Sequence, residues 1–384
     1  MIKDFGLSIE GAGFKHTFDN EISSVNYTTS ILMGDNISLD TLDITLQQTS
    51  FKDQNIYQYF RSLSRISSSD PKNLIATFSV GDYSTKFYNI ADAQPAGISF
   101  KDITPPSFRM TTFPKKTAKS YDSMQAIYQQ KSLFAIFKAV MKSNSIPEEN
   151  VSIIGDDIIF ADENETYNMF KSEGVSTLEF IRKLCLYYGY AIINRDNKIT
   201  LKNFTNIEKE QDPTLTIDLE SLKMVNGRIQ GLPDGMVSFL PKANLEPILE
   251  AVSIIKQDPI LDTYKISTLK NPGVQNVTYQ NKGGYITTKE FMPERTLLSR
   301  AKAIIREAQQ KLRKINIVYS KIINIFAGDT VRIKCYENYF SKTYLVLETS
   351  HYADRKTMKT SMVLIENFNT ADFEVEFNFE EING

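Results

Sequence analysis

Hydrophobic residues alternate with polar ones over much of the first 110 residues. The alternation is clearest at residues 5–9, 39–46 and 76–80. A period of two is typical of strands that bury one face. We therefore expect an antiparallel β domain over residues 1–112, with one short amphipathic helix near residues 56–66.

The pattern changes to a helical period beyond a proline-rich boundary. Five apolar residues then recur at the spacing of one helix face: Leu133, Ile136, Phe137, Val140 and Met141. Short apolar runs follow at residues 153–154 and 158–160. Together with the unit at residues 174–204, they predict a small α+β domain over residues 113–211, inserted between two β regions.

The helix that opens the 174–204 unit has a marked start. Ser176 and Glu179 have the spacing of a capping box, in which each side chain satisfies an amide of the first turn. Arg182 and Lys183 fall outside the apolar stripe and are expected on the solvent side. The stripe itself is formed by Leu178, Ile181, Leu184, Cys185 and Tyr188.

The same unit continues as a hairpin. Gly189 supplies the left-handed residue with which helices commonly end. Residues 190–193 and 199–201 are short strand-like runs, and the polar residues 194–198 between them predict a turn.

Strand signals resume at residues 214–217 and run from residue 317 to residue 364. Residues 231–284 have an irregular pattern, and a long amphipathic helix follows with Pro293 in its first turn. The apolar face of that helix is expected to carry Leu297, Ala301, Ile304, Ile305, Ala308, Leu312 and Ile315.

These signals predict a second β domain over residues 212–370. An excursion and the long helix interrupt it at about residues 241–314. An acidic and aromatic tail follows at residues 371–384. The expected fold class is α+β, mainly β.

Two segments of the chain resemble the baseplate hub proteins of contractile phage tails. The first is GVSTLEFIRKLCLYYGYAIINRDNKITLKNF, in which a Tyr-Gly-Tyr helix end leads into a hairpin with an Asp-Asn tip. The second is AGDTVRIKCYENYFSKTYLVLETSHYADRKTMKTSMVLIEN, in which a Gly-Asp turn opens the closing strands. This family also includes the late control D proteins and the hub part of type VI secretion spikes.

The resemblance implies a structural protein without enzymatic activity. Each subunit would hold two tail-tube-like antiparallel β-barrels, and a homotrimer would join the hexameric tail tube to the trimeric central spike. Expected partners are the spike protein, the tail tube or tube-initiator protein and other baseplate proteins. The protein would be made in the host cytoplasm and would line the DNA or effector channel of the virion tail baseplate. The alternative is a tail-associated peptidoglycan hydrolase or glycan-binding adhesin.

Charge and composition exclude some other classes. The 384 residues carry a formal net charge of −2, and the basic residues are scattered among acidic ones, so specific nucleic-acid binding is not expected. No signal-peptide core and no apolar run of about 20 residues is visible, so stable membrane insertion is not expected either. The two cysteines, Cys185 and Cys335, are expected to be reduced and packed.

Residues for catalysis, cofactor binding or metal binding are not apparent. The only histidines are His16 and His351, and neither has Cys or carboxylate neighbours at ligand spacing. We expect both imidazoles to be hydrogen-bonded or exposed, with His351 at the end of a strand. The carboxylates of residues 156–165 lack the glycine of an EF-hand loop and are expected to be solvated.

The tail carries the one candidate binding site. If it forms a strand, Phe373, Val375, Phe377 and Phe379 would share one face, with acidic residues on the other. This apolar face could dock on the chain's own barrel or add to the spike protein. A solvated, frayed tail is the alternative.

Overall fold

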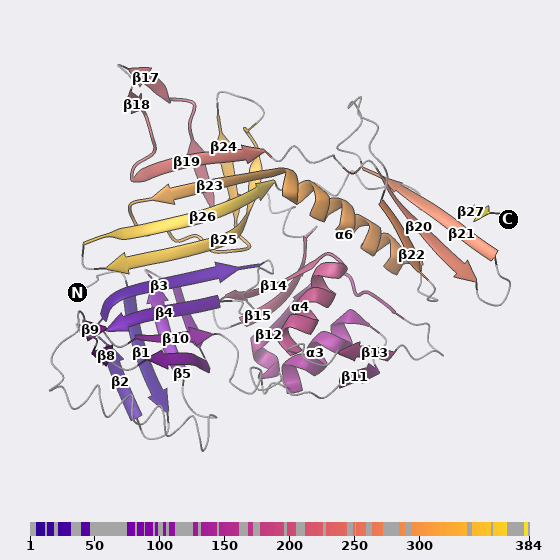
Figure 1. Ribbon diagram of the computed structural model, residues 1–384, viewed down its shortest axis with the longest axis horizontal. Coiled ribbons are helices and arrows are strands. Elements are labelled where there is room, and N and C mark those ends of the chain that lie inside the picture. Colours follow the sequence, from indigo (N-terminus) through magenta and orange to yellow (C-terminus); the bar gives the residue numbers. More distant parts are fainter. Residues whose placement is uncertain are drawn as a thin grey trace.

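The computed structural model describes residues 5–11, 14–18, 22–31, 40–46, 75–80, 83–87, 89–94, 97–98, 103–104, 107–111, 126–129, 132–143, 146–160, 168–171, 177–195, 198–204, 212–225, 228–243, 249, 251–258, 263–271, 284–288, 294–335, 340–354, 356–366 and 380–382. The fold is mainly β, and most strand pairs are antiparallel (Figure 1). The helix expected near residues 56–66 lies outside the described residues. Among the described helices, none is long and apolar enough to cross a bilayer.

A ten-stranded sheet links the first and second β regions. Its strands run in the order β19-β23-β26-β25-β3-β4-β10-β7, and β24 and β16 branch from β25. The first half of the sheet is formed by β3 (Ile22–Ser30), β4 (Asp40–Leu46), β7 (Asn89–Gln94) and β10 (Ser107–Thr111). The second half is formed by β16 (Leu215–Asp218), β19 (Met236–Ala243), β23 (Arg313–Tyr319), β24 (Thr330–Lys334), β25 (Thr343–Asp354) and β26 (Met358–Glu366).

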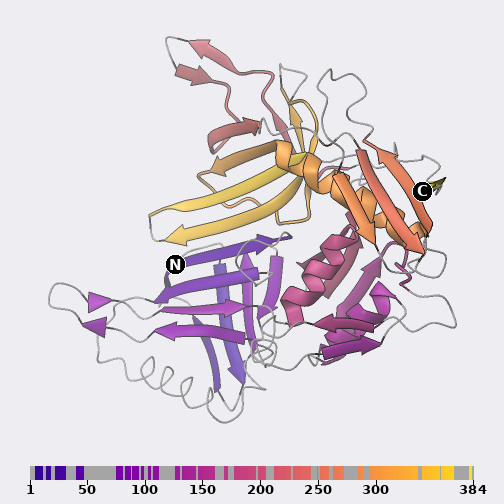
Figure 2. The same ribbon diagram turned by 45° about the vertical axis from the view of Figure 1, so that its right-hand side comes forward.

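The two halves meet at a seam, where β3 pairs antiparallel with β25. Residues Ser24 to Ser30 lie opposite Asp354 to Glu348. Figures 1 and 2 both show the yellow strands of the second half continuing into the indigo strands of the first. Strands from the two ends of the chain therefore share one hydrogen-bonded sheet.

The first half packs its apolar face against a second, four-stranded sheet. Tyr27 and Phe78 are fully buried between the two layers, with ring centroids 5.2 Å apart. The four strands, in spatial order, are β2 (Phe14–Phe18), β1 (Phe5–Gly11), β5 (Ile75–Val80) and β6 (Tyr83–Phe87). A small separate hairpin, β8 (Gly97–Ile98) and β9 (Ile103–Thr104), lies between β7 and β10 in the chain. The period of two predicted these strands correctly.

Each half of the large sheet is bent by two register shifts. They lie in the pairs β3–β4 and β7–β10 of the first half, and in β25–β26 and β19–β23 of the second. Such bulges bend the strand that carries them and increase its twist. The described strands do not close into a barrel, so the two expected barrels remain a prediction.

The helices and hairpin expected in the middle of the chain are confirmed, but the turn is shorter than the expected 194–198, because residues 194, 195 and 198 belong to the two strands. All five apolar residues of the first helix stripe are buried, and Gly189 has φ +80° after the second helix. The described elements are β11 (Ala126–Gln129), α3 (Leu133–Ser143), η3 (Glu148–Asn150), β12 (Val151–Ile154), β13 (Asn168–Lys171), α4 (Thr177–Tyr187), β14 (Tyr190–Arg195) and β15 (Lys198–Asn203). Ser176 and its expected cap lie outside the described residues.

Arg182 corrects the prediction for α4. It was expected in solvent, but it is 2% exposed, whereas Lys183 is exposed as expected. The stripe identified one buried face only, and α4 contacts α3, α6 and β14. A helix with neighbours on more than one side buries more than one face.

The excursion is also more regular than its sequence pattern suggested. The expectation of an irregular stretch at residues 231–284 is wrong, because it contains β20 (Ala251–Asp258) and β21 (Thr263–Lys270). These strands form a sheet with β22 (Gly284–Thr288) and with β27 (Glu380–Ile382), in the order β22-β20-β21-β27. Residues 223–230 form a separate hairpin of β17 (Lys223–Val225) and β18 (Arg228–Gln230).

The long helix α6 (Glu294–Leu312) joins the excursion to the second half. Leu297, Ala301 and Ile305 pack on apolar residues of β20 and β21, as the stripe predicted. The helix passes into β23 without a loop, so Ile315 belongs to the strand and not to the helix face. Figure 1 shows α6 extending from the large sheet to the small one.

Candidate functional site

The structure does not assemble an active site from the residues that the sequence singled out. Among the described residues, no group of three or more His, Cys, Asp and Glu side chains could hold a metal ion. His16 lies in β2, and Asp156 is exposed, whereas Asp157 accepts a hydrogen bond from the Phe134 amide at the start of α3. Both cysteines are free, and Cys185 is fully buried.

The candidate partner-binding residues Phe373, Val375, Phe377 and Phe379 lie outside the described residues. The last part of the tail, β27, pairs antiparallel with β21 of the small sheet. This strand therefore adds to the chain's own excursion, which was neither of the two docking sites expected for the tail.

The two segments that carry the family resemblance contact each other directly. Gly328 of the second segment has φ +94°, and a Cβ atom there would lie 2.8 Å from Cδ1 of Ile193 in the first. Only glycine combines this left-handed backbone with such a close approach. The Gly-Asp turn is therefore shaped to receive β14 of the inserted domain.

An apolar cluster extends this contact to all three parts of the molecule. It contains residues of the first half, the middle segment (residues 126–204) and the second half, and each is nearly inaccessible to solvent. Its buried members are Ile31, Ala191, Phe204, Ala327, Leu345, Leu347 and Ile365. We call the place where these parts meet the junction.

Asp329 is the polar anchor of the junction on the second half. Its Oδ1 accepts a hydrogen bond from Arg195 Nη2 at 2.5 Å, and its Oδ2 accepts one from the Phe326 amide at 2.8 Å. The Arg195 guanidinium also lies over the Phe326 ring, 5.7 Å from the centroid. One carboxylate thus orders its own turn and holds the inserted domain.

Asp40 occupies the matching place on the first half. Its Oδ2 accepts hydrogen bonds from Asn194 Nδ2 at 2.9 Å and from the Tyr27 hydroxyl at 3.4 Å. Burial raises its pKa to about 7, although these bonds and the nearby Arg182 and Arg195 favour the charged form. Burial likewise lowers the pKa of Arg182 to about 10.

His351 lies on the seam beside these groups, and it corrects the prediction made from sequence. It is 0% exposed and lies within β25, not at its end, and neither ring nitrogen has a hydrogen-bond partner among the described residues. Its ring stacks on Tyr27 at 6.1 Å and meets Phe326 edge-on at 5.1 Å. Burial lowers its pKa to about 4, so the imidazole is neutral at physiological pH.

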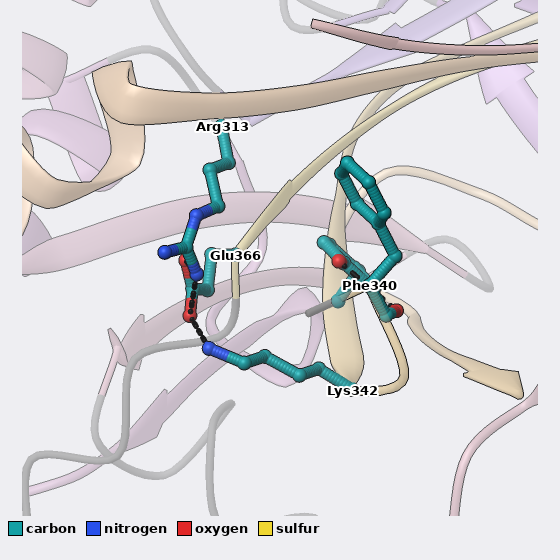
Figure 3. Close-up of polar contacts among 5 residues, drawn as sticks. Arg313, Phe340, Lys342 and Glu366 are labelled. Atoms are coloured by element: carbon teal, nitrogen blue, oxygen red, sulfur yellow. Dashed lines mark hydrogen bonds and ion pairs between the residues drawn. The ribbon is translucent and has the colours of Figure 1, made fainter. Parts of the chain in front are cut away.

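A second polar cluster lies at the other side of the second half, where α6 enters the sheet. Figure 3 shows Arg313 and Lys342 converging on Glu366. The carboxylate accepts from Arg313 Nη1 at 2.8 and 3.1 Å, and Lys342 approaches the same group. Glu366 is 15% exposed, and this cluster ties the start of β23 to the end of β26.

These arrangements hold elements of the fold together. The junction joins carboxylates, amides and guanidinium groups that mostly satisfy one another. The sequence marked the two segments that meet there, but it did not indicate Asp40, which contacts a residue 154 positions away. A buried aspartate in an alternating strand carries no local signal of its partner.

Comparison by sequence identifies no relative, since neither a family model nor a curated protein matches this chain. Comparison by structure does. A tail protein of Neisseria meningitidis MC58 has a TM-score of 0.62 at 9% identity, covering 94% of this chain and 96% of its own. The 43 kDa tail protein of prophage MuSo2 from Shewanella oneidensis has a TM-score of 0.58 at 10% identity, covering 94% and 98%.

A third neighbour comes from a secretion system. The E. coli c3393 protein, a type VI secretion component with structural similarity to the phage T4 tail proteins gp27 and gp5, has a TM-score of 0.52 at 9% identity. The match covers 93% of this chain and 76% of the c3393 protein. Over nearly its whole length, this chain therefore has the fold of phage tail proteins and of a type VI secretion component.

Proposed function

We propose that this protein is a structural baseplate hub of a phage tail or related injection machine. As a homotrimer, it would join the hexameric tail tube to the trimeric central spike and line the channel between them. The observation that carries the proposal is the build of the large sheet from two equivalent halves. Three subunits with two equivalent halves each supply the six units that a sixfold tube requires.

A similarity in strand pairing supports this reading, although the outer strands follow β3 and β4 in the chain in one half and precede β25 and β26 in the other. Read outward from the seam, the first half runs β3-β4-β10-β7 and the second runs β25-β26-β23-β19. In each half the first two strands are consecutive in the chain and antiparallel, and each half has two register shifts. Because bulges curve a sheet, the arrangement favours a sheet that bends toward closure with other copies.

The face of the sheet turned away from the core has the chemistry of a channel wall. At the seam, Ser350 lies opposite Thr28 on one side and opposite Ser361 on the other, and all three are half-buried. In the next row, Arg109 is neutralised by Asp43 at 2.6 Å. Hydroxyl groups and paired charges would let a polyanion pass without the tight, salt-dependent contacts that unpaired Lys and Arg make.

The structural neighbours support the same role. Two are tail proteins, one of them from a prophage, and one is a type VI secretion component, so the shared fold occurs in both kinds of protein. We propose the spike, the tube or tube-initiator and other baseplate proteins as partners. A scaffold needs surfaces and not a reactive residue, and we propose that the protein has no enzymatic activity.

The test is to locate and count the protein in assembled particles. Tail particles would be purified from the producing host, and quantitative mass spectrometry would compare this chain with the spike and tube proteins. We expect one trimer per particle, equimolar with the spike chain, and loss of the spike from particles when the gene is deleted. Absence of the protein from particles that still carry spike and tube would contradict the proposal.

A further inference from the structure

The last described strand, β27, covers only part of the sheet edge on which it lies. It pairs with residues Tyr264 to Ile266 of β21. On its other side, β21 pairs with β20 over its full length, from Thr263 to Lys270. Among the described residues, Ser267 to Lys270 therefore have a strand partner on one side only. Such an edge offers backbone amides and carbonyls to a further extended segment.

This part of the β21 edge has two different faces. Ser267 and Leu269 are buried, and Leu269 belongs to the apolar cluster that packs the small sheet on α6. Thr268 and Lys270 are exposed, and the Thr268 hydroxyl is hydrogen-bonded to Ser253 of β20 at 2.8 Å. A strand that fits here has apolar residues on the α6 side and polar residues on the other side.

The sequence directly before β27 alternates in the same way. Residues 367–379 lie outside the described residues, and residues 376–379 read EFNF. The pairing of β27 sets Glu380 opposite Ile266. Continued one residue at a time, this register sets Phe379 opposite Ser267, Asn378 opposite Thr268, Phe377 opposite Leu269 and Glu376 opposite Lys270.

The continued register matches both faces of β21. Residues directly opposite each other in an antiparallel pair have side chains on the same face, so both phenylalanines fall on the α6 side. β27 already has Glu381 opposite Lys265, and the continuation sets a second acid, Glu376, opposite Lys270. A shift by one residue would turn both phenylalanines to solvent and the glutamate to the apolar side.

The path of the chain brings the tail to this edge from the correct end. β26 ends at Glu366, which binds Arg313 where α6 enters the large sheet. The end of β19 also pairs with Arg313, and residues 244–250 lead from there to Ala251, opposite Lys270. The Lys270 end of β21 is therefore the near one for a tail that leaves Glu366, as an antiparallel strand requires.

The tail is also long enough. Residues 367–375 span about 30 Å when extended, which is close to the full length of α6, about 28 Å. Figure 1 shows the small sheet extending along α6, with β27 and the C-terminus on the side away from the large sheet.

We propose that residues 376–379 continue β27 along the β21 edge, so that Phe377 and Phe379 complete the apolar layer between the small sheet and α6. The chain's own tail, and not a partner protein, is then the closing strand of the excursion. Phe373 and Val375 lie beyond the end of β21 and take no part. This inference goes beyond the proposed function and does not depend on it.

A pair of cysteines on the exposed face tests the register. The variant Lys270→Cys, Glu376→Cys places two thiols directly opposite each other, where Cα atoms about 4.5–5.5 Å apart allow a disulfide. The control Lys270→Cys, Glu374→Cys lies two residues further along the same face, which is too far to bridge. Both variants also carry Cys335→Ser, so that this thiol does not compete. Mass spectrometry after mild oxidation would count the bridge, and a non-reducing gel would show whether it joins one chain or two.

A second pair of variants tests the two phenylalanines. Phe377→Ser, Phe379→Ser removes both apolar side chains, and Phe373→Ser, Val375→Ser makes the same kind of change outside the contact. Amide hydrogen exchange of the full-length protein would be followed by mass spectrometry in peptides that cover β21. Peptides of the large sheet would show that the rest of the fold is unchanged.

We expect a disulfide within one chain for the Glu376 pair, with a yield about tenfold above that of the Glu374 control. Exchange in β21 should be about tenfold faster in Phe377→Ser, Phe379→Ser than in its control. Equal yields from the two cysteine pairs would overturn the inference, as would the absence of a bridge. A bridge between two chains would also overturn it and would identify a second copy as the source of the strand. Equal exchange in the two serine variants would show that the phenylalanines do not cover this edge.

Discussion

The two strands that meet at the seam differ in how their buried polar groups are satisfied. On β3, the Tyr27 hydroxyl donates to Asp40, and Thr29 Oγ1 accepts a hydrogen bond from the Ala327 amide at 2.9 Å. On β25, directly opposite, Thr349 Oγ1 and both nitrogens of His351 have no partner in the part of the chain that the structure describes. The two halves are equivalent in strand order but not in the polarity of their core.

The difference follows from what reaches each strand. The Gly-Asp turn brings the Ala327 amide to β3, and β14 of the inserted domain brings Asn194 to Asp40. On β25, His351 instead packs against the aromatic rings of Tyr27 and Phe326. Two halves with similar strand arrangements can therefore contact their buried polar residues differently: by hydrogen bonds on β3 and by aromatic rings on β25.

The largest effect is expected when the turn that serves β3 is disturbed. Gly328→Val forces a β-branched residue into a left-handed backbone and places new atoms against Ile193, which should cost about 3 kcal/mol of unfolding free energy. Urea denaturation would measure the loss. Adding Ile193→Ala should recover the part of the lost unfolding free energy that comes from the steric clash. If the double variant instead loses as much stability as the two single variants together, the close contact between Gly328 and Ile193 is contradicted.

The titratable groups on the two halves should give opposite pH dependences. Asp40 has a folded pKa of about 7, above the ordinary 3.8, so its contribution to stability is full near pH 4 and is lost as the pH rises to 7. His351 has a folded pKa of about 4, below the ordinary 6.5, so its contribution is full above pH 6.5 and is lost as the pH falls to 4.

Two single variants test separately how Asp40 and His351 make stability depend on pH. In Asp40→Asn, stability should fall more steeply on acidification than in the wild type; in His351→Phe, it should rise on acidification instead. Each change is worth roughly 2 kcal/mol across the window. Thermal unfolding between pH 4 and pH 7 would measure both. Parallel curves for the two variants would show that neither group titrates in the folded protein as described.

A matched pair of substitutions tests the asymmetry of the seam itself. Thr29 and Thr349 lie opposite each other, and both are buried. Thr29→Val leaves the Ala327 amide without an acceptor and should cost about 1–2 kcal/mol. Thr349→Val removes a hydroxyl that has no partner and should change stability by less than about 0.5 kcal/mol. If both cost the same, the two strands are not distinguished by hydrogen bonding.

A modest effect that depends on salt is expected at the charged cluster around Glu366. Glu366→Gln keeps the shape of the side chain but removes its charge beside Arg313 and Lys342. Because Lys342 is 40% exposed, we expect a loss of only about 1 kcal/mol, and less at high salt. Denaturation at two salt concentrations would check this. A loss as large as that of Gly328→Val would place the main anchor of the second half here and not at the junction.

The elements that could be predicted from sequence are those decided by local patterns. The α3 stripe, the end of α4 at Gly189 and the hairpin after it depend on neighbours a few residues apart, and all three were correct. The strands of residues 231–284 were missed because their apolar runs are short and alternate only in part. β20, for example, reads AVSIIKQD and alternates only in part.

The junction could not be predicted because its partners are distant in the chain. Arg182 looked solvent-exposed from its place on the helix, and only the packing of α4 shows that it is buried. His351 looked like an ordinary polar residue, and nothing local indicates that rings from Tyr27 and Phe326 enclose it. The sequence did identify the two segments that meet there, because each carries its own turn glycine.

The seam also sets an order of events during synthesis. Asn26 and Ser350, which hydrogen-bond across it, are 324 positions apart. At about 10 residues per second, a ribosome needs on the order of half a minute to make that stretch. Throughout that time the β3 edge of the nascent chain has no β25 to pair with. The first half must therefore persist as an unfinished domain until β25 has been made, and chaperones that shield strand edges should have the most effect on yield during this interval.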